Sequence, residues 1–264
     1  MKLLKTSIRW FFLILVFSCS TDAENAIALG EEPENMVPME EEPEDIVPAR
    51  TLSVKELEFI EEYEYVTFNL APDSFGASVN EKWVVDGRIF LDGAISETYS
   101  AEVETALTQF NNLFNASIAF ELVPTVEESN IHLIFGKKED IREIWPDMFE
   151  AIGDINFKGY ALYNQDEDFN ITKGRIWVEN ESIPLFRHEL GHAIGLGHAS
   201  GSYCGGTIES NQSFMCSFLK EEFSVFDKAI IQTLYNPQVE VGFTFSQLKP
   251  IIVELLLTGV ILIE

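Results

Sequence analysis

The sequence predicts an α+β fold for the central part of this chain, and three observations lead to that class. Short apolar segments bounded by turn residues are typical of strands. A longer segment with apolar residues every three or four positions is typical of a helix that packs on a sheet. In addition, 46% of the 264 residues are hydrophobic, which is enough to build one sizeable core.

The expected helices have apolar residues at helical spacing and recognisable start signals. Ser53 with Glu56 matches a capping box for a short helix over residues 53–65. Pro184 suits the first turn of a second helix over residues 184–196. The clearest amphipathic helix covers residues 96–114, and its apolar stripe consists of Val103, Leu107, Phe110 and Phe114. The expected strands are residues 118–123, 130–135, 159–164 and 174–179.

The stretch from His188 to His198 has the pattern H-E-x-x-H-x-x-G-x-x-H and holds three of the chain's 4 histidines. Residues four apart lie on one face of a helix, so His188 and His192 can present their imidazoles to one metal ion. Gly195 allows the chain to turn sharply out of the helix, which can return His198 to the same ion.

This pattern predicts a catalytic zinc centre. Three neutral imidazoles leave one position open on a tetrahedral Zn²⁺ ion, whereas structural zinc sites are closed by four protein ligands. Glu189 follows His188 directly, so its carboxylate is expected beside the metal, where it can take a proton from water.

The motif resembles that of the metzincin clan of zinc endopeptidases, in which it is followed by a Met-turn. Met215, within residues 213–216, is the candidate for that methionine, which forms an apolar floor under the metal. Residues 223–235 resemble the closing helix of matrixin-like catalytic domains, and residues 82–83 with 87–91 resemble their first strand. The resemblance covers roughly residues 80–236.

The resemblance implies the finer architecture and the place of the substrate. It implies a twisted, mostly parallel sheet with an antiparallel edge strand, a backing helix, an active-site helix and a small C-terminal subdomain. Residues 159–163 resemble the edge strand above the cleft, so an extended peptide would pair there. The residues expected to contact its backbone are Gly159, Tyr160, Ala161 and Leu162.

The chain also departs from the family pattern. Ala199 stands where matrixins usually have serine, and Cys216 follows the methionine where tyrosine or histidine is common. The sequence therefore offers no tyrosine fifth ligand. It also shows no matrixin-like cysteine-switch prosegment, and the subfamily stays open.

Two of the three cysteines lie between the third histidine and the end of the Met-turn. An exported protein meets an oxidising compartment, where a disulfide between Cys204 and Cys216 would persist. The alternative is two free thiols that add metal ligands.

The first residues have the pattern of an export signal. Basic residues precede a short apolar run over residues 10–17, and Ser18 is followed directly by Cys19. This resembles a bacterial lipobox, so residues 1–18 are expected to be a signal peptide and Cys19 a lipidation site. We expect an exported outer-membrane or cell-surface lipoprotein of a Gram-negative bacterium.

The remaining segments complete the expected organisation. Residues 19–50 contain an imperfect ten-residue acidic repeat with regular prolines, which predicts an extended tether. Residues 51–79 are either an N-terminal extension or a prosegment. Residues 80–237 form the expected catalytic domain, and residues 238–264 form an apolar C-terminal extension that either packs on the core or binds a partner.

The charge of the chain limits its partners. A net charge of −27 argues against nucleic acid and against anionic membrane surfaces, leaving a lipid anchor as the expected membrane attachment. The acidic residues 164–170 allow two interpretations, a structural Ca²⁺ loop or a solvated hairpin turn.

The predicted function is that of a monomeric zinc-dependent endopeptidase acting on protein or peptide substrates. Two alternatives stay open. The first is a surface-binding lipoprotein with a structural zinc ion and no catalysis. The second is a zinc amidase that acts on cell-wall peptide.

Overall fold

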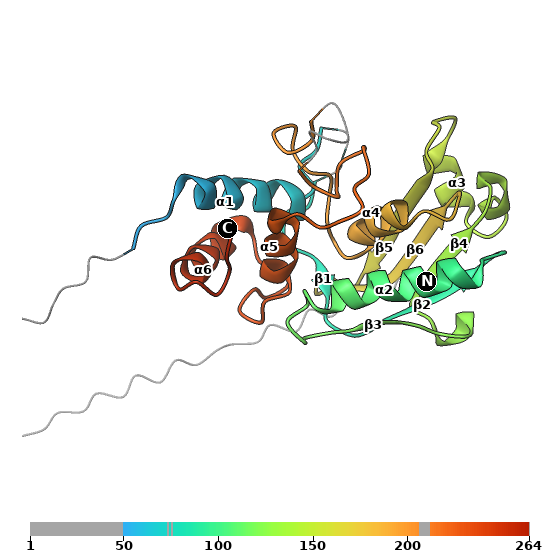
Figure 1. The fold of residues 1–264 in the computed structure, drawn as a ribbon, viewed down its shortest axis with the longest axis horizontal. Coiled ribbons are helices and arrows are strands. Elements are labelled where there is room, and N and C mark those ends of the chain that lie inside the picture. The colour runs from blue at the N-terminus through green and yellow to red at the C-terminus, as the bar shows by residue number, and fades with distance from the viewer. Residues whose placement is uncertain (1–49, 73, 75, 206–211, 264) are drawn as a thin grey trace, which may run out of the picture. The chain divides into compact units, whose positions relative to one another are not determined.

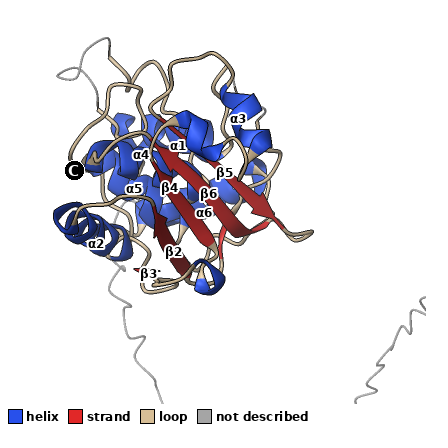
Figure 2. Cartoon of the chain, turned by 90° about the vertical axis from the view of Figure 1, so that its right-hand side faces the viewer, coloured by secondary structure: helices blue, strands red, loops and turns tan. Residues whose placement is uncertain are grey.

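A mostly parallel six-stranded sheet lies at the centre of the part of the chain that the structure describes (Figures 1 and 2). This computed structural model describes residues 50–72, 74, 76–205 and 212–263, so Cys19 and the predicted signal and tether up to residue 49 lie outside the described residues. The strands are β1 Lys82–Trp83, β2 Gly87–Asp92, β3 Phe120–Leu122, β4 Ile131–Phe135, β5 Gly159–Gln165 and β6 Asn170–Val178.

The topology of the sheet leaves one long strand at the edge. The order is β1-β6-β4-β2-β3, with all four of these pairings parallel, and β5 pairs antiparallel with β6. Within the described residues β5 has no second strand partner. The prediction of an α+β fold with a mostly parallel sheet is thus confirmed.

Both faces of the sheet are covered, because alternate residues of each strand point to opposite sides. One face packs against α2 Glu97–Asn111 and α4 Ile183–Ala193, and its strands contribute Leu133, Phe135, Ile176 and Val178. The other face carries Ile134 and Trp177, which pack against the 3₁₀ turn Lys138–Ile141 and α3 Pro146–Ile152.

Three further helices gather at one end of the sheet (left in Figure 1): α1 Val54–Thr67, α5 Val225–Leu234 and α6 Phe245–Leu257. The predicted capping box of Ser53 and Glu56 is present at the start of α1. The ring of Phe59 on α1 lies 5.3 Å from that of Phe226 on α5, and Phe68 lies 6.0 Å from Phe245 on α6. The described helices include none with the length and apolar character to cross a membrane.

Two segments differ from the sequence-based expectation. Residues 82–83 and 87–91 were expected to form one strand, but β1 pairs with β6 and β2 pairs with β3 and β4. Val84 and Val85, both about half exposed, form the bend between them. Strand β6 begins at Asn170 rather than at residue 174, so β5 and β6 form one hairpin.

Candidate metal centre

Helix α4 positions the first two histidines. The Ser182 side chain accepts a hydrogen bond from the Leu185 amide at 3.4 Å, which caps the helix start, and Pro184 occupies the first turn. His188 and His192 follow one helical turn apart. The helix ends at Ala193, and Gly195 has φ +98°, a left-handed conformation that suits glycine and redirects the chain.

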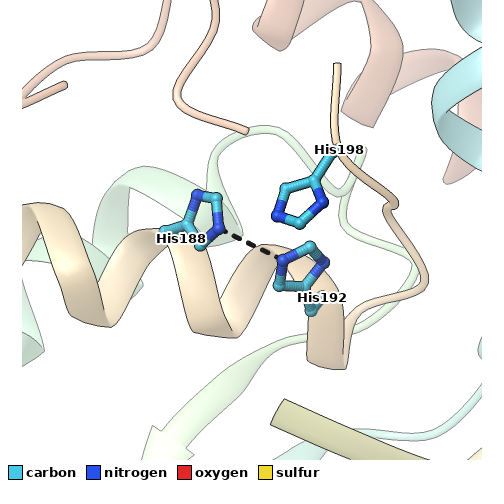
Figure 3. A group of neighbouring side chains, drawn as sticks. All are labelled: His188, His192 and His198. Carbon is cyan, nitrogen blue, oxygen red and sulfur yellow. Dashed lines mark hydrogen bonds between the residues drawn. The ribbon is translucent and has the colours of Figure 1, made fainter. Parts of the chain in front are cut away.

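The redirected chain brings His198 to the other two histidines (Figure 3). One ring nitrogen from each of His188, His192 and His198 lies within 4.8 Å of the others. The Nε2 atoms of His188 and His192 are 3.2 Å apart. The structure therefore brings the three predicted metal ligands together, and they can hold a metal ion.

The hydrogen bonds of the outer ring nitrogens set the proton positions. His188 Nδ1 lies 2.9 Å from the Phe214 carbonyl oxygen, and His192 Nδ1 lies 2.8 Å from the Leu196 carbonyl oxygen. Because a carbonyl only accepts, each Nδ1 carries a hydrogen and donates it. Each neutral ring then presents an unprotonated Nε2 to the space between the three histidines. A histidine that binds a metal through Nε2 has this same tautomer.

Burial keeps these rings neutral. It lowers the pKa of His188 to about 4, and it lowers the pKa of His192 well below the ordinary value. Two neutral Nε2 lone pairs facing each other at 3.2 Å share no proton and repel. A cation between them removes that repulsion, so the donor set fits a metal ion.

Glu189 packs against the edge strand β5. It is 5% exposed, and no hydrogen bond from the described residues reaches its carboxylate. A Cβ atom placed on Gly159 of β5 would lie 2.5 Å from Glu189 Oε1, so a larger residue there would force the carboxylate to shift. Burial raises the pKa of Glu189 to about 8 in the metal-free protein, and a nearby dication would favour its charged form.

Met215 lies against α4, next to Gly191. Its side chain is 1% exposed, and a Cβ atom on Gly191 would collide with its sulfur. The turn is tied to the start of α5 by Asp227, whose carboxylate accepts hydrogen bonds from the Ser213 hydroxyl at 2.6 Å and the Phe214 amide at 3.2 Å. Asp227 was not singled out from the sequence, although its place three residues after the cap residue Ser224 was a usable signal.

Cys204 and Cys216 form a disulfide with a sequence separation of 12. Their sulfurs are therefore not metal ligands in this structure. The bond joins the loop after His198 to the residue that follows Met215.

The other predicted site residues lie on β5 and in the hairpin that follows it. Gly159 reaches Glu189, while Tyr160 and Leu162 pack against the second apolar cluster and Ala161 against the main core. In residues 164–170, one oxygen of Asp166 accepts hydrogen bonds from the Asp168 and Asn170 amides at 2.9 and 3.0 Å, which is the pattern of a hairpin turn. Among the described residues, the three histidines are the one cluster with metal-ligand spacing.

The three-histidine cluster and the mostly parallel sheet are compatible with a metalloprotease fold. No protein-family model matches this chain, and a search of curated proteins found no match for it either.

Proposed function

We propose that this protein is a zinc-dependent endopeptidase that resembles the metzincins. One observation carries the proposal: three histidines converge on one point, and the residue after the first of them, Glu189, is a buried carboxylate to which no described residue donates a hydrogen bond. A purely structural site has no need for such a carboxylate, because leaving a buried acid without a partner is costly. A hydrolytic site needs it as a proton acceptor.

The spacing of the first two histidines fits zinc. Imidazole nitrogens lie about 2.0–2.1 Å from zinc, so two of them in a tetrahedral site are about 3.3 Å apart. The Nε2 atoms of His188 and His192 lie at 3.2 Å. A zinc ion held by His188, His192 and His198 would supply the Lewis acidity that lowers the pKa of water and polarises a peptide carbonyl.

Glu189 performs the proton transfers in this proposal. One of its carboxylate oxygens accepts a proton from the attacking water and then donates that proton to the nitrogen of the leaving amine. Gly159 keeps the carboxylate in place by leaving space for it, and burial excludes bulk water from around it.

The open edge of β5 supports a peptide or protein as the substrate. An extended peptide can add to that edge as a further strand through its backbone groups, next to Gly159, Tyr160, Ala161 and Leu162. Because β5 passes Glu189 at Gly159, such a peptide would cross the metal centre.

We further propose that the enzyme is an exported lipoprotein, anchored through Cys19 and acting as a monomer on substrates outside the cytoplasm. The lipobox-like sequence supports the anchor. The Cys204–Cys216 disulfide is consistent with an oxidising compartment.

The test is cleavage of a denatured protein by wild type, Glu189→Gln and the control Glu121→Gln, which changes an exposed carboxylate on β3. Loss of the proton acceptor should lower the turnover of Glu189→Gln about 10²–10⁴-fold, with one zinc per chain retained. The control should match wild type, and a chelator should abolish cleavage.

Unchanged turnover in Glu189→Gln would reject the mechanism. Two further results would favour other functions. Stoichiometric zinc without cleavage of any protein or peptide library member would favour a structural site, and hydrolysis confined to cell-wall peptide amides would favour the amidase.

A further inference from the structure

The loop that carries the third histidine is held from two sides. We call residues 195–200 the third-ligand loop. On the side of α4, the Leu196 amide of this loop donates to the Gly191 carbonyl at 3.0 Å. On the side of the Met-turn, the Ala199 amide donates to the Met215 carbonyl at 3.1 Å. These contacts come from within the predicted catalytic segment.

The other contacts of the loop come from α1, far away in the sequence. The Gly197 amide donates to the Val66 carbonyl at 2.7 Å, and the Ser200 amide donates to Glu62 Oε1 at 2.8 Å. Glu62 and Val66 are one turn apart on α1, so the loop runs along one face of that helix. The two bonded amides flank His198.

Both contacts are built into the interior. Glu62 is 4% exposed, and the Ser200 amide supplies a hydrogen bond that lowers the cost of burying its carboxylate. Val66 lies in the last turn of α1, and its carbonyl oxygen accepts from the Gly197 amide at 2.7 Å and more distantly from the Asn69 amide at 3.4 Å. A Cβ atom on Gly197 would collide with Asn69 Oδ1 and lie 2.9 Å from Asn69 Cα, so the approach requires glycine.

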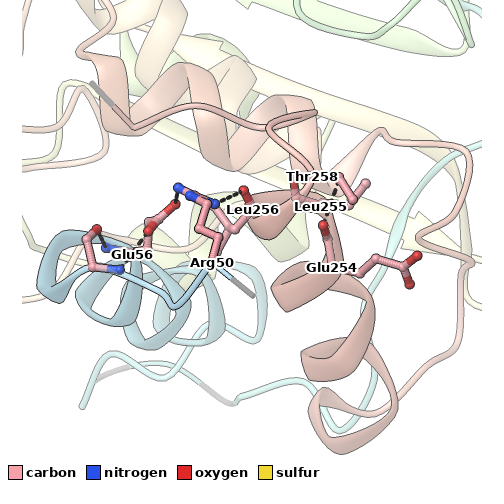
Figure 4. A network of polar contacts seen from close by, with 7 residues as sticks. Arg50, Glu56, Glu254, Leu255, Leu256 and Thr258 are labelled. Atoms are coloured by element: carbon pink, nitrogen blue, oxygen red, sulfur yellow. Dashed lines mark hydrogen bonds and ion pairs between the residues drawn. The ribbon is translucent and has the colours of Figure 1, made fainter. Parts of the chain in front are cut away.

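The far end of α1 is fixed to the C-terminal helix. Arg50 Nη1 donates to the Leu256 carbonyl of α6 at 2.5 Å, and its Nη2 pairs with Glu56 of α1 at 2.5 Å (Figure 4). Phe59 and Tyr63, on the buried face of α1, are 0% exposed. Removal of α1 would expose the part of the core that this apolar face covers.

We infer that α1 is a permanent positioning element of the metal centre, which holds the third-ligand loop so that His198 stays against His188 and His192. This inference rests on the proposed metal-binding role of the histidines. It assigns residues 51–79 to the working enzyme, not to a prosegment that is removed on activation. Glu62 and Gly197 act through His198 and touch neither substrate nor metal.

The test measures metal binding in the full chain with four variants. Zn²⁺ affinity is obtained by competition with a chromophoric chelator, and Co²⁺ absorption reports the geometry of the site. Glu62→Ala and Gly197→Ala should each weaken Zn²⁺ binding about 10- to 100-fold and alter the Co²⁺ spectrum, as loss of ligand-orienting contacts does elsewhere. Glu62→Gln should stay near wild type, because its amide oxygen still accepts from Ser200.

Glu61→Ala is the matched control, because Glu61 lies beside Glu62 on the exposed face of α1. Wild-type affinity and spectrum in folded Glu62→Ala and Gly197→Ala would overturn the inference and leave α1 as packing alone. If Glu62→Ala does not fold, Gly197→Ala and Glu62→Gln decide the question by the same criteria. A wild type that binds no zinc refutes the proposed function and this inference together. A wild type that binds zinc but cleaves nothing refutes only the peptidase activity.

Discussion

At the scale of single residues, the space left by Gly159 governs the position of the proposed proton acceptor. An alanine Cβ there would lie 2.5 Å from Oε1 of Glu189 and 2.8 Å from its Cδ, so the buried carboxylate would have to move. We expect Gly159→Ala to lower kcat/KM at least about 10-fold, since a misplaced catalytic group loses rate steeply. Zinc affinity should be unchanged, because the histidines are not displaced.

The control for this substitution is Gly201→Ala, since a Cβ atom at Gly201 meets no atom within 4 Å. Peptidase assays and zinc titrations on both variants check the prediction. Equal kcat/KM values in the two variants would show that Glu189 tolerates the added methyl group.

A second residue, Lys82, makes the stability of the protein depend on pH. Its ammonium group is buried and donates to the carbonyls of Leu234 at 3.0 Å and Val239 at 2.5 Å. Burial lowers its pKa to about 8, whereas an unfolded chain has a lysine pKa near 10.4. Between these values the unfolded state binds more protons, so the contribution of Lys82 to stability rises with pH.

The prediction compares wild type with Lys82→Met, so that the titration of all other groups cancels. From pH 8 to pH 10.5 the free energy of unfolding of wild type should rise relative to the variant by up to about 3 kcal/mol. Urea unfolding at several pH values measures this difference. A difference that stays constant over the range would contradict the shifted pKa.

At the scale of elements, the turn that holds Met215 depends on three attachments: Gly191 above it, Asp227 beside it and the disulfide to Cys204. With a separation of 12 residues, the disulfide should stabilise the fold by about 3 kcal/mol through loop closure. We expect the double variant Cys204→Ser, Cys216→Ser to lose about that free energy of unfolding. Urea titration measures the loss, and a stability equal to that of wild type would show that Asp227 and packing suffice.

The same elements show what could be predicted from sequence and what could not. The histidines and Glu189 lie within eleven consecutive residues, and helix geometry alone places two ligands together. Glu62 and Ser200 are 138 residues apart, so their contact follows only from the tertiary packing of α1. Likewise, the separation of β1 from β2 depends on which strands pair with them, which local apolar pattern does not encode.

At the scale of the whole described unit, the first helix, α1, and the last helix, α6, pack together in one layer. Helices α1 and α6 lie near opposite ends of the described residues but are joined by Arg50 and by the Phe68–Phe245 contact. The apolar character of residues 238–264 was compatible with core packing or with a partner surface. The structure has α6 packed into the core through Leu248, Ile252, Leu255 and Leu256.

This packing predicts a contrast between two apolar residues of the C-terminal segment. Ile252 is 0% exposed, so Ile252→Ala should cost about 2–5 kcal/mol of folding free energy. Leu262 is 65% exposed, so Leu262→Ala should change that free energy by less than about 0.5 kcal/mol. Because α6 holds Arg50 and α1 holds the third-ligand loop, Ile252→Ala should also weaken zinc binding near its unfolding midpoint. Equal stability losses in the two variants, measured by urea unfolding, would mean that α6 does not form part of the core.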